Sequence, residues 1–87
     1  MPSLALSATE SIEFPLRTDY IDLLQLLKAT GICATGGEAK FWVEVGAISV
    51  DGEPEFRKRR KLRVGNRVQI TAPEHGAPDV EITLAAI

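Results

Sequence analysis

Seven of the ten Lys and Arg residues in this chain lie between positions 57 and 67, and no acidic residue interrupts them. The other 76 positions carry all twelve Asp and Glu residues, so the formal net charge of −2 hides a concentrated positive segment. Like charges packed this closely repel one another unless a polyanion or a nearby acidic surface compensates them. The segment therefore predicts phosphate binding, and the alternative is a solvated charged loop. Its basic residues are Arg57, Lys58, Arg59, Arg60, Lys61, Arg63 and Arg67.

A second candidate for anion binding begins at Thr35, the first residue of a Thr-x-x-Glu sequence typical of a capped helix start. Free N–H groups at such a start favour an anion, and Gly36 and Gly37 would let a phosphate approach the backbone closely. Simple helix-entry geometry is the alternative explanation for the two glycines. Lys40 should project toward the same anion, although it could instead pair with Glu44 one turn later.

Residue patterns typical of catalysis are absent from the sequence. Cys33 is the only cysteine, so we expect a buried or half-buried apolar residue and no intrachain disulfide. His75 is the only histidine and lies in a loop rich in proline and glycine, with no predicted nucleophile near it. No glycine-rich phosphate loop or metal-spaced cluster is present. We therefore expect no enzyme, metal, cofactor or small-molecule substrate.

The sequence also predicts where the chain resides. No apolar run approaches the ~18–20 residues of a membrane span, and the N-terminus lacks the pattern of a signal peptide. A cytoplasmic protein that does not contact membranes is expected.

Two helices should position the basic residues. A leucine-rich helix is predicted over residues 19–30, capped by Thr18 or Asp19 and stopped by Gly31. A second helix is predicted over residues 35–45, stopped by Gly46. We expect the aromatic side chains of Phe41, Trp42 and Phe56 to pack in the core and not to stack on bases. We also expect no base stacking from Tyr20.

Short strands should complete the fold. Alternating apolar residues predict an edge strand over residues 11–16, a strand over residues 67–72 and a final strand around residues 80–84. Residues 48–50 and 53–56 flank Asp51-Gly52, which is a strong hairpin signal. One small antiparallel or mixed sheet packed by two helices is the economical α+β arrangement, and the first and last strands could pair. Residues 1–10 are poorly patterned, and residues 11–87 are predicted to form a single domain.

The stretch from residue 22 to residue 70 resembles the S4 RNA-binding domain family, and the whole chain is most similar to its small bacterial stand-alone members. The resemblance rests on the leucine-rich helix ending at Gly31-Ile32, the capped start at residues 35–40, the helix exit at residues 45–48, the hairpin at residues 50–52 and the glycine turn at residues 64–68. It implies the S4-like (αL) fold, with two packed helices followed by a small sheet, here with an added N-terminal strand. Asp22 and Gln25 occupy positions where the family usually has basic residues.

The resemblance implies a surface that docks on folded RNA, mostly through phosphates. Carried over by position, the start of the second helix and the hairpin tip would line this surface, and the basic run would flank it. The predicted RNA-binding residues are Thr35, Gly36, Gly37, Lys40, Asp51, Gly52, Arg57, Lys58, Arg59, Arg60 and Lys61.

The predicted function is therefore the binding of structured RNA, ribosomal or otherwise folded, by a monomer. A different class of function remains open, namely a protein-interaction adaptor whose basic loop binds an acidic partner or the acidic remainder of another copy. DNA binding ranks last, because no predicted helix carries a basic face that could read bases.

Overall fold

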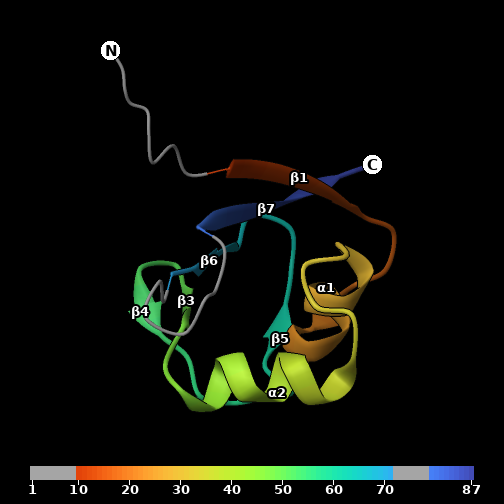
Figure 1. Cartoon of the computed structure of the whole chain (residues 1–87). Helices are drawn as coiled ribbons and strands as arrows, with labels where there is room; N and C mark the ends of the chain where they lie inside the picture. The colour runs from red at the N-terminus through yellow and green to blue at the C-terminus, as the bar shows by residue number, and fades with distance from the viewer. Residues whose placement is uncertain (1–9, 72–78) are drawn as a thin grey trace.

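A five-stranded sheet and two short helices share one hydrophobic core in the computed structural model, which describes residues 10–71 and 79–87 (Figure 1). The helices are α1 (Leu23–Ala29) and α2 (Gly36–Glu44). The strands are β1 (Glu10–Leu16), β2 (Ile21–Asp22), β3 (Ile48–Val50), β4 (Glu53–Pro54), β5 (Lys61–Leu62), β6 (Arg67–Ile70) and β7 (Val80–Ala86). This arrangement confirms the predicted α+β class. Among the described residues, none of the helices has the length and apolarity needed to cross a membrane.

The main sheet has the strand order β1-β7-β6-β3-β4. The first and last strands do pair, and they run parallel, whereas the other neighbours are antiparallel. Strand β1 is the edge strand that its proline predicted. Val80, Ile82 and Leu84 of β7 all point into the core, as their alternation with polar residues requires.

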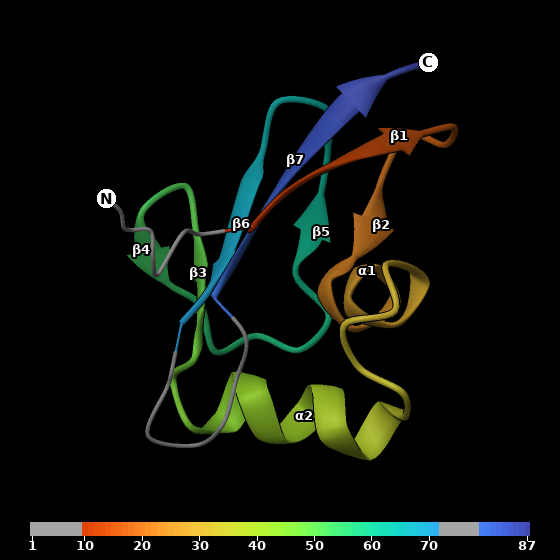
Figure 2. The ribbon, with the colours of Figure 1, turned by 45° about the horizontal axis from the view of Figure 1, so that its top comes forward.

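The first helix is shorter than predicted, and its cap is Asp22 rather than Thr18 or Asp19. Asp22 Oδ1 accepts a hydrogen bond from the Gln25 N–H (2.8 Å), and Gln25 Oε1 accepts one from the Asp22 N–H (3.3 Å). The prediction failed because Ile21 and Asp22 pair with β5 and form the small antiparallel sheet β2–β5, which holds them extended. Figure 2 shows this pair of strands beside α1. The helix ends as expected, with Gly31 at φ 79°.

The second helix lies where the sequence placed it, with Thr35 as its cap and Gly46 at φ 80° after its end. Thr35 Oγ1 accepts a hydrogen bond from the Glu38 N–H (3.1 Å). The Glu38 carboxylate does not return to Thr35, however, but accepts a hydrogen bond from the Ala34 N–H (2.8 Å). In the predicted capping box Glu38 would accept from the Thr35 N–H. It accepts instead from the N–H one residue earlier in the chain.

The predicted hairpin is confirmed, with β3 and β4 antiparallel around Asp51 (φ 52°) and Gly52 (φ 87°). Its second strand is shorter than predicted and ends at Pro54, so Phe56 lies outside the sheet. Phe56 is 61% exposed and Phe41 43% exposed, and the expectation that both lie in the core is wrong. Trp42 is buried, as predicted.

The core lies between the sheet and the helices. It contains Leu23, Leu26 and Leu27 of α1, Ala39, Trp42 and Val43 of α2, and the inward residues of β3, β6 and β7. Cys33 is buried there, as expected. His75 lies outside the described residues, and so do residues 1–9, so the predictions for them stay predictions.

Candidate nucleic-acid interface

The basic loop, residues 57–60, links β4 to β5 and lies over the start of α1. The first two N–H groups of this helix, those of Leu23 and Leu24, donate to the carbonyls of Arg60 (3.0 Å) and Lys58 (3.3 Å). These two N–H groups are therefore satisfied within the protein. The loop is fixed against the helix by its own backbone, which sets the direction of its side chains.

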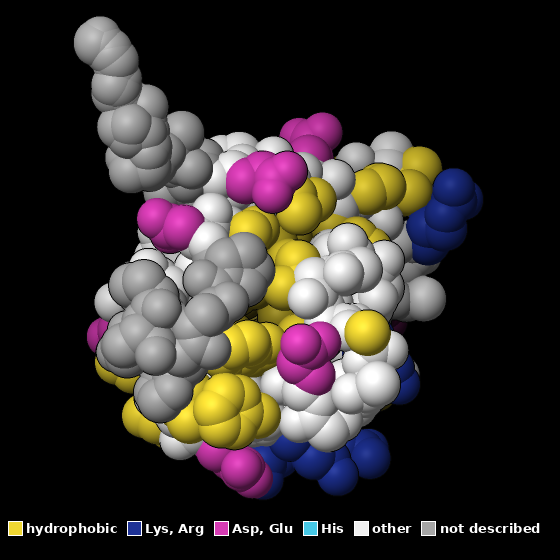
Figure 3. Space-filling view, viewed as in Figure 1, with side chains coloured by type: hydrophobic (Ala, Val, Ile, Leu, Met, Phe, Trp, Pro, Cys, Tyr) yellow, Lys and Arg dark blue, Asp and Glu magenta, His cyan; other side chains and the backbone are white. Residues whose placement is uncertain are grey.

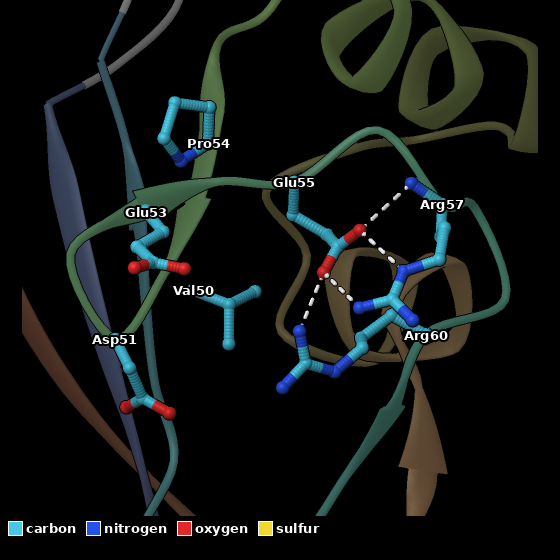
Figure 4. Close-up of a pocket in the computed structure, with 7 residues that line it drawn as sticks. All are labelled: Val50, Asp51, Glu53, Pro54, Glu55, Arg57 and Arg60. Carbon is cyan, nitrogen blue, oxygen red and sulfur yellow. Dashed lines mark hydrogen bonds and ion pairs between the residues drawn. The ribbon is translucent and has the colours of Figure 1, made fainter.

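Glu55 holds two arginines of the loop, as the dashed lines between its carboxylate and Arg57 and Arg60 show (Figure 4). Its side chain is buried, and Oε2 accepts hydrogen bonds from the Arg57 backbone N–H (3.0 Å) and Nε (2.9 Å). Oε1 accepts from Arg57 Nη2 (3.1 Å) and Arg60 Nη1 (2.5 Å). The hydrogen bonds from Arg57, together with Arg60, lower the pKa of the Glu55 carboxyl to about 2. This carboxylate remains charged at neutral pH and partly neutralises the loop.

A second acid compensates the basic run from α2. Lys58 Nζ lies 2.8 Å from Glu44 Oε2, and this hydrogen bond and charge lower the pKa of Glu44. Glu44 thus pairs with Lys58, and no ion pair between Glu44 and Lys40 is found among the described residues. Part of the compensation that the basic run needs therefore comes from Glu55 and Glu44.

Arg59 differs from its neighbours in the loop. Its side chain is exposed, and within the described ranges it makes no hydrogen bond or ion pair. It lines a hollow of about 260 Å³ together with Lys28 of α1 and with Gly36 and Lys40 of α2. We call this hollow the interhelix groove, and its remaining lining residues are Asp22, Leu24 and Gln25.

The interhelix groove unites three predicted site residues that come from two distant segments: Gly36, Lys40 and Arg59. Lys28 was not predicted. It lies three residues after Gln25, and this helical spacing could have placed it on the same face. Asp22 and Gln25 cap α1. This role gives a structural reason for an acid and an amide at two positions where the S4 family usually has basic residues.

The glycines at the start of α2 have no steric or conformational reason to be glycine. Neither Gly36 nor Gly37 has a positive φ. A Cβ added at Gly36 would meet no atom within 4 Å, and at Gly37 only Thr35 Oγ1 at 3.9 Å. Thr35 takes the N–H groups of Glu38 and Ala39, which leaves those of Gly36 and Gly37 without a hydrogen bond in the described part of the chain. Helix entry therefore does not require these glycines, and two backbone donors remain unused among the described residues.

The hairpin tip lies in a different hollow, lined by Asp51, Gly52, Gly65, Arg67, Gln69 and Glu81. Asp51 accepts hydrogen bonds from Asn66 Nδ2 (2.7 Å) and the Arg67 N–H (3.0 Å). Its carboxylate thus joins the hairpin to the turn before β6. Asp51 and Gly52 are not brought together with the interhelix groove.

The remaining predicted residues, Arg57, Arg60 and Lys61, line a third hollow, which Arg59 also lines. Figure 3 shows one face of the molecule, on which acidic side chains are spread over the surface and Lys and Arg side chains appear only at the edges. This face is therefore mostly acidic where it carries charge.

The described residues meet neither the needs of a metal site nor those of a reactive thiol. No group of three His, Cys, Asp or Glu residues could hold a metal among residues 10–71 and 79–87. Burial raises the pKa of the Cys33 thiol to about 11, with a smaller effect from Glu38, so it is not a thiolate at neutral pH.

Residues 14–76 match the family model described as the S4 domain. The chain is 40% identical over 53 residues to the probable ribosome maturation protein RlbA of Bacillus subtilis (strain 168), covering 61% of this chain and 75% of that protein. It is 39% identical over 49 residues to the putative RNA-binding protein YbcJ of Escherichia coli (strain K12), covering 56% and 70%.

The fold agrees with this match. The solution structure of YbcJ from E. coli, described as revealing an αL motif involved in RNA-binding, superposes with a TM-score of 0.59 at 25% identity, covering 95% of this chain and 98% of that one. This confirms the predicted fold. Because the S4 match spans most of the sequence and contains both helices, the hairpin and the basic loop, the chain belongs to the S4 domain family.

Proposed function

We propose that this chain binds structured RNA by placing RNA phosphates in the interhelix groove. One observation carries the proposal: Lys28, Lys40 and Arg59 line this groove together with Gly36, whose N–H makes no hydrogen bond among the described residues. Three cations beside a free N–H at a helix start form a surface that suits an anion with several oxygens. The S4 match and the RNA-binding descriptions of YbcJ support RNA as that anion.

The binding is proposed to read RNA shape rather than sequence. Phosphate contacts position a protein on RNA but carry no direct information about the bases. The RlbA relative is named for ribosome maturation, which supports ribosomal RNA as the first ligand to test. The family match and the relatives offer no catalytic evidence, and we propose a non-enzymatic, cytoplasmic role.

A salt series tests the electrostatic basis of the proposal. If about four to six phosphates are neutralised, the logarithm of the affinity should fall with the logarithm of salt with a slope of roughly −3 to −5. The purified full chain would be titrated with a folded ribosomal RNA fragment and with duplex DNA. Preference for RNA with a slope in this range supports the proposal, and a slope near zero refutes it.

Charge-removal variants test the location. Lys28→Ala, Lys40→Ala and Arg59→Ala should each weaken RNA binding and reduce the magnitude of the salt slope by about 1. Arg67→Ala is the matched control, because it removes the same charge beside the hairpin tip. Equal losses in all four variants would show that the footprint is not centred on the interhelix groove.

A protein-interaction adaptor is the second candidate, and the exposed Phe56 beside the basic loop favours it. Aromatic residues, Phe included, and Arg are both enriched at protein interfaces. We propose that the chain itself is a monomer, and sedimentation across a range of concentrations and salt tests this. A mass that grows with concentration and collapses in salt would favour self-association through the basic loop.

A further inference from the structure

Tyr20 lies in a setting that suits an unpaired nucleotide. Its side chain is 43% exposed, and two cations of the basic segment lie over its ring. Lys61 Nζ is 4.8 Å from the ring centroid, and Arg63 Cζ is 5.8 Å from it. The sequence alone predicts no base stacking from Tyr20, because nothing in it places Lys61 and Arg63, more than forty positions later in the chain, beside its ring.

The small sheet β2–β5 produces this arrangement. Ile21 pairs with Leu62 and Asp22 with Lys61, so the register continued by one residue places Tyr20 opposite Arg63. Arg63 Nη1 also donates to the Asp19 carbonyl (3.5 Å), and Thr18 Oγ1 donates to the Tyr20 carbonyl (2.7 Å). The ring is therefore carried on a segment whose backbone is held in place.

A hollow of about 650 Å³ adjoins the ring, lined by Thr18, Asp19, Tyr20, Ile21, Gln25 and Ala29. This volume falls within the ~300–1,000 Å³ typical of ligand sites. Gln25 also lines the interhelix groove, so this one side chain borders both hollows. A strand of RNA bound in the groove would reach the tyrosine without leaving the protein surface.

We propose that this hollow, the Tyr20 hollow, binds one unpaired nucleotide of a bound RNA, with its base stacked on Tyr20 and its phosphate beside Lys61 and Arg63. The aromatic ring can stack on a base, and the cations beside it can bind the phosphate of the same nucleotide. Unpaired bases are the ones free to stack on protein side chains. The phosphate is assigned to Lys61 and Arg63 because these cations lie over the ring, whereas the residue with a carboxylate that lines the hollow itself is Asp19. The inference rests on the proposed RNA binding and specifies its ligand as RNA with a bulged or looped-out nucleotide.

The test compares two RNA duplexes that differ only by a single bulged nucleotide. Wild type should bind the bulged duplex more tightly by roughly 5- to 150-fold, the range measured for one base stacked on an aromatic residue. Tyr20→Leu should remove this preference without changing the affinity for the paired duplex, and Tyr20→Phe should keep it. Phe56→Leu is the matched control, because Phe56 is another exposed aromatic residue and does not line the Tyr20 hollow.

A second readout uses the unmodified protein. Tyr20 is the only tyrosine of the chain, so its ring resonances in an NMR spectrum have a single source. They should shift upfield with the bulged duplex and remain in place with the paired one. If RNA binds but these resonances do not move, or if Phe56→Leu alone removes the preference, the inference is wrong while the proposed function stands. If neither duplex nor a ribosomal fragment binds, both fail.

Discussion

The carboxylate of Glu55 lies between two guanidinium groups, with Oε1 2.5 Å from Nη1 of Arg60 and Oε2 2.9 Å from Nε of Arg57. A buried carboxylate thus holds two arginines that the sequence predicted to bind RNA phosphates. The adjacent arginines of this loop consequently have different roles, and this difference governs how each should respond to substitution.

Substitution of neighbouring arginines should separate folding from binding. Arg60→Ala removes a partner of a buried carboxylate and should lower the free energy of unfolding by about 1–3 kcal/mol. Arg59→Ala removes an exposed side chain and should change it by less than about 0.5 kcal/mol, yet weaken RNA binding. Urea unfolding and RNA titration of both variants would check this. The reverse pattern would mean that the structural and binding roles are exchanged.

Glu55 should make the stability depend on pH in the acid range. Its pKa is about 2 in the folded protein, against an ordinary value of 4.5, so the folded state holds the charged form more strongly. This contribution is complete above pH 4.5 and is lost as the pH falls from 4.5 toward 2. Glu55→Gln should therefore be less stable than wild type at pH 7, and the difference should shrink at pH 3. A difference that stays constant over this range would contradict the assigned cause.

Alanine at the start of α2 should stabilise the fold while weakening RNA binding. Gly36→Ala meets no atom and replaces a helix residue of low propensity, so we expect a gain of up to about 1 kcal/mol. The new methyl group would lie where a phosphate approaches the backbone. Thermal unfolding and RNA titration measure the two effects.

The control for that substitution is Gly46→Ala. Gly46 has φ 80°, a left-handed conformation that alanine rarely adopts, so this variant should lose about 1–2 kcal/mol of stability. If Gly36→Ala leaves RNA affinity unchanged, the backbone of α2 does not contact phosphate.

The hairpin tip and the turn before β6 should be energetically coupled. Asn66 Nδ2 donates to the Asp51 carboxylate at 2.7 Å. A double-mutant cycle with Asp51→Gly, which retains the positive φ, and Asn66→Ala should give a coupling of roughly 0.5–1.5 kcal/mol. Additive losses in urea unfolding would show that this hydrogen bond contributes nothing.

Cys33 should react slowly in the native state. Its thiol is 2% exposed, and its pKa is raised to about 11. An alkylating reagent at pH 8 should label it much more slowly in buffer than in denaturing urea. Equal rates would indicate that the segment between α1 and α2 opens readily.

Local patterns in the sequence were enough for most of the fold. The glycines at positions 31 and 46 ended two helices, Asp51-Gly52 formed the hairpin, and alternation in the last strand identified its buried face. Each of these features depends on backbone geometry or on burial of one side of an element, which neighbouring residues determine. The S4 resemblance was carried by the same local features.

Tertiary structure decided which basic residues are free of ion pairs within the protein and can therefore bind phosphate. The sequence could not show that Glu55 and Glu44 engage Arg57, Arg60 and Lys58, since ion pairs depend on where the chain folds back. Nor could it reveal the pairing of β2 with β5, which shortened α1, made Asp22 its cap and carried Lys61 to Tyr20. Contacts between distant segments set these positions, and composition alone treats all seven cations of the basic segment as equivalent.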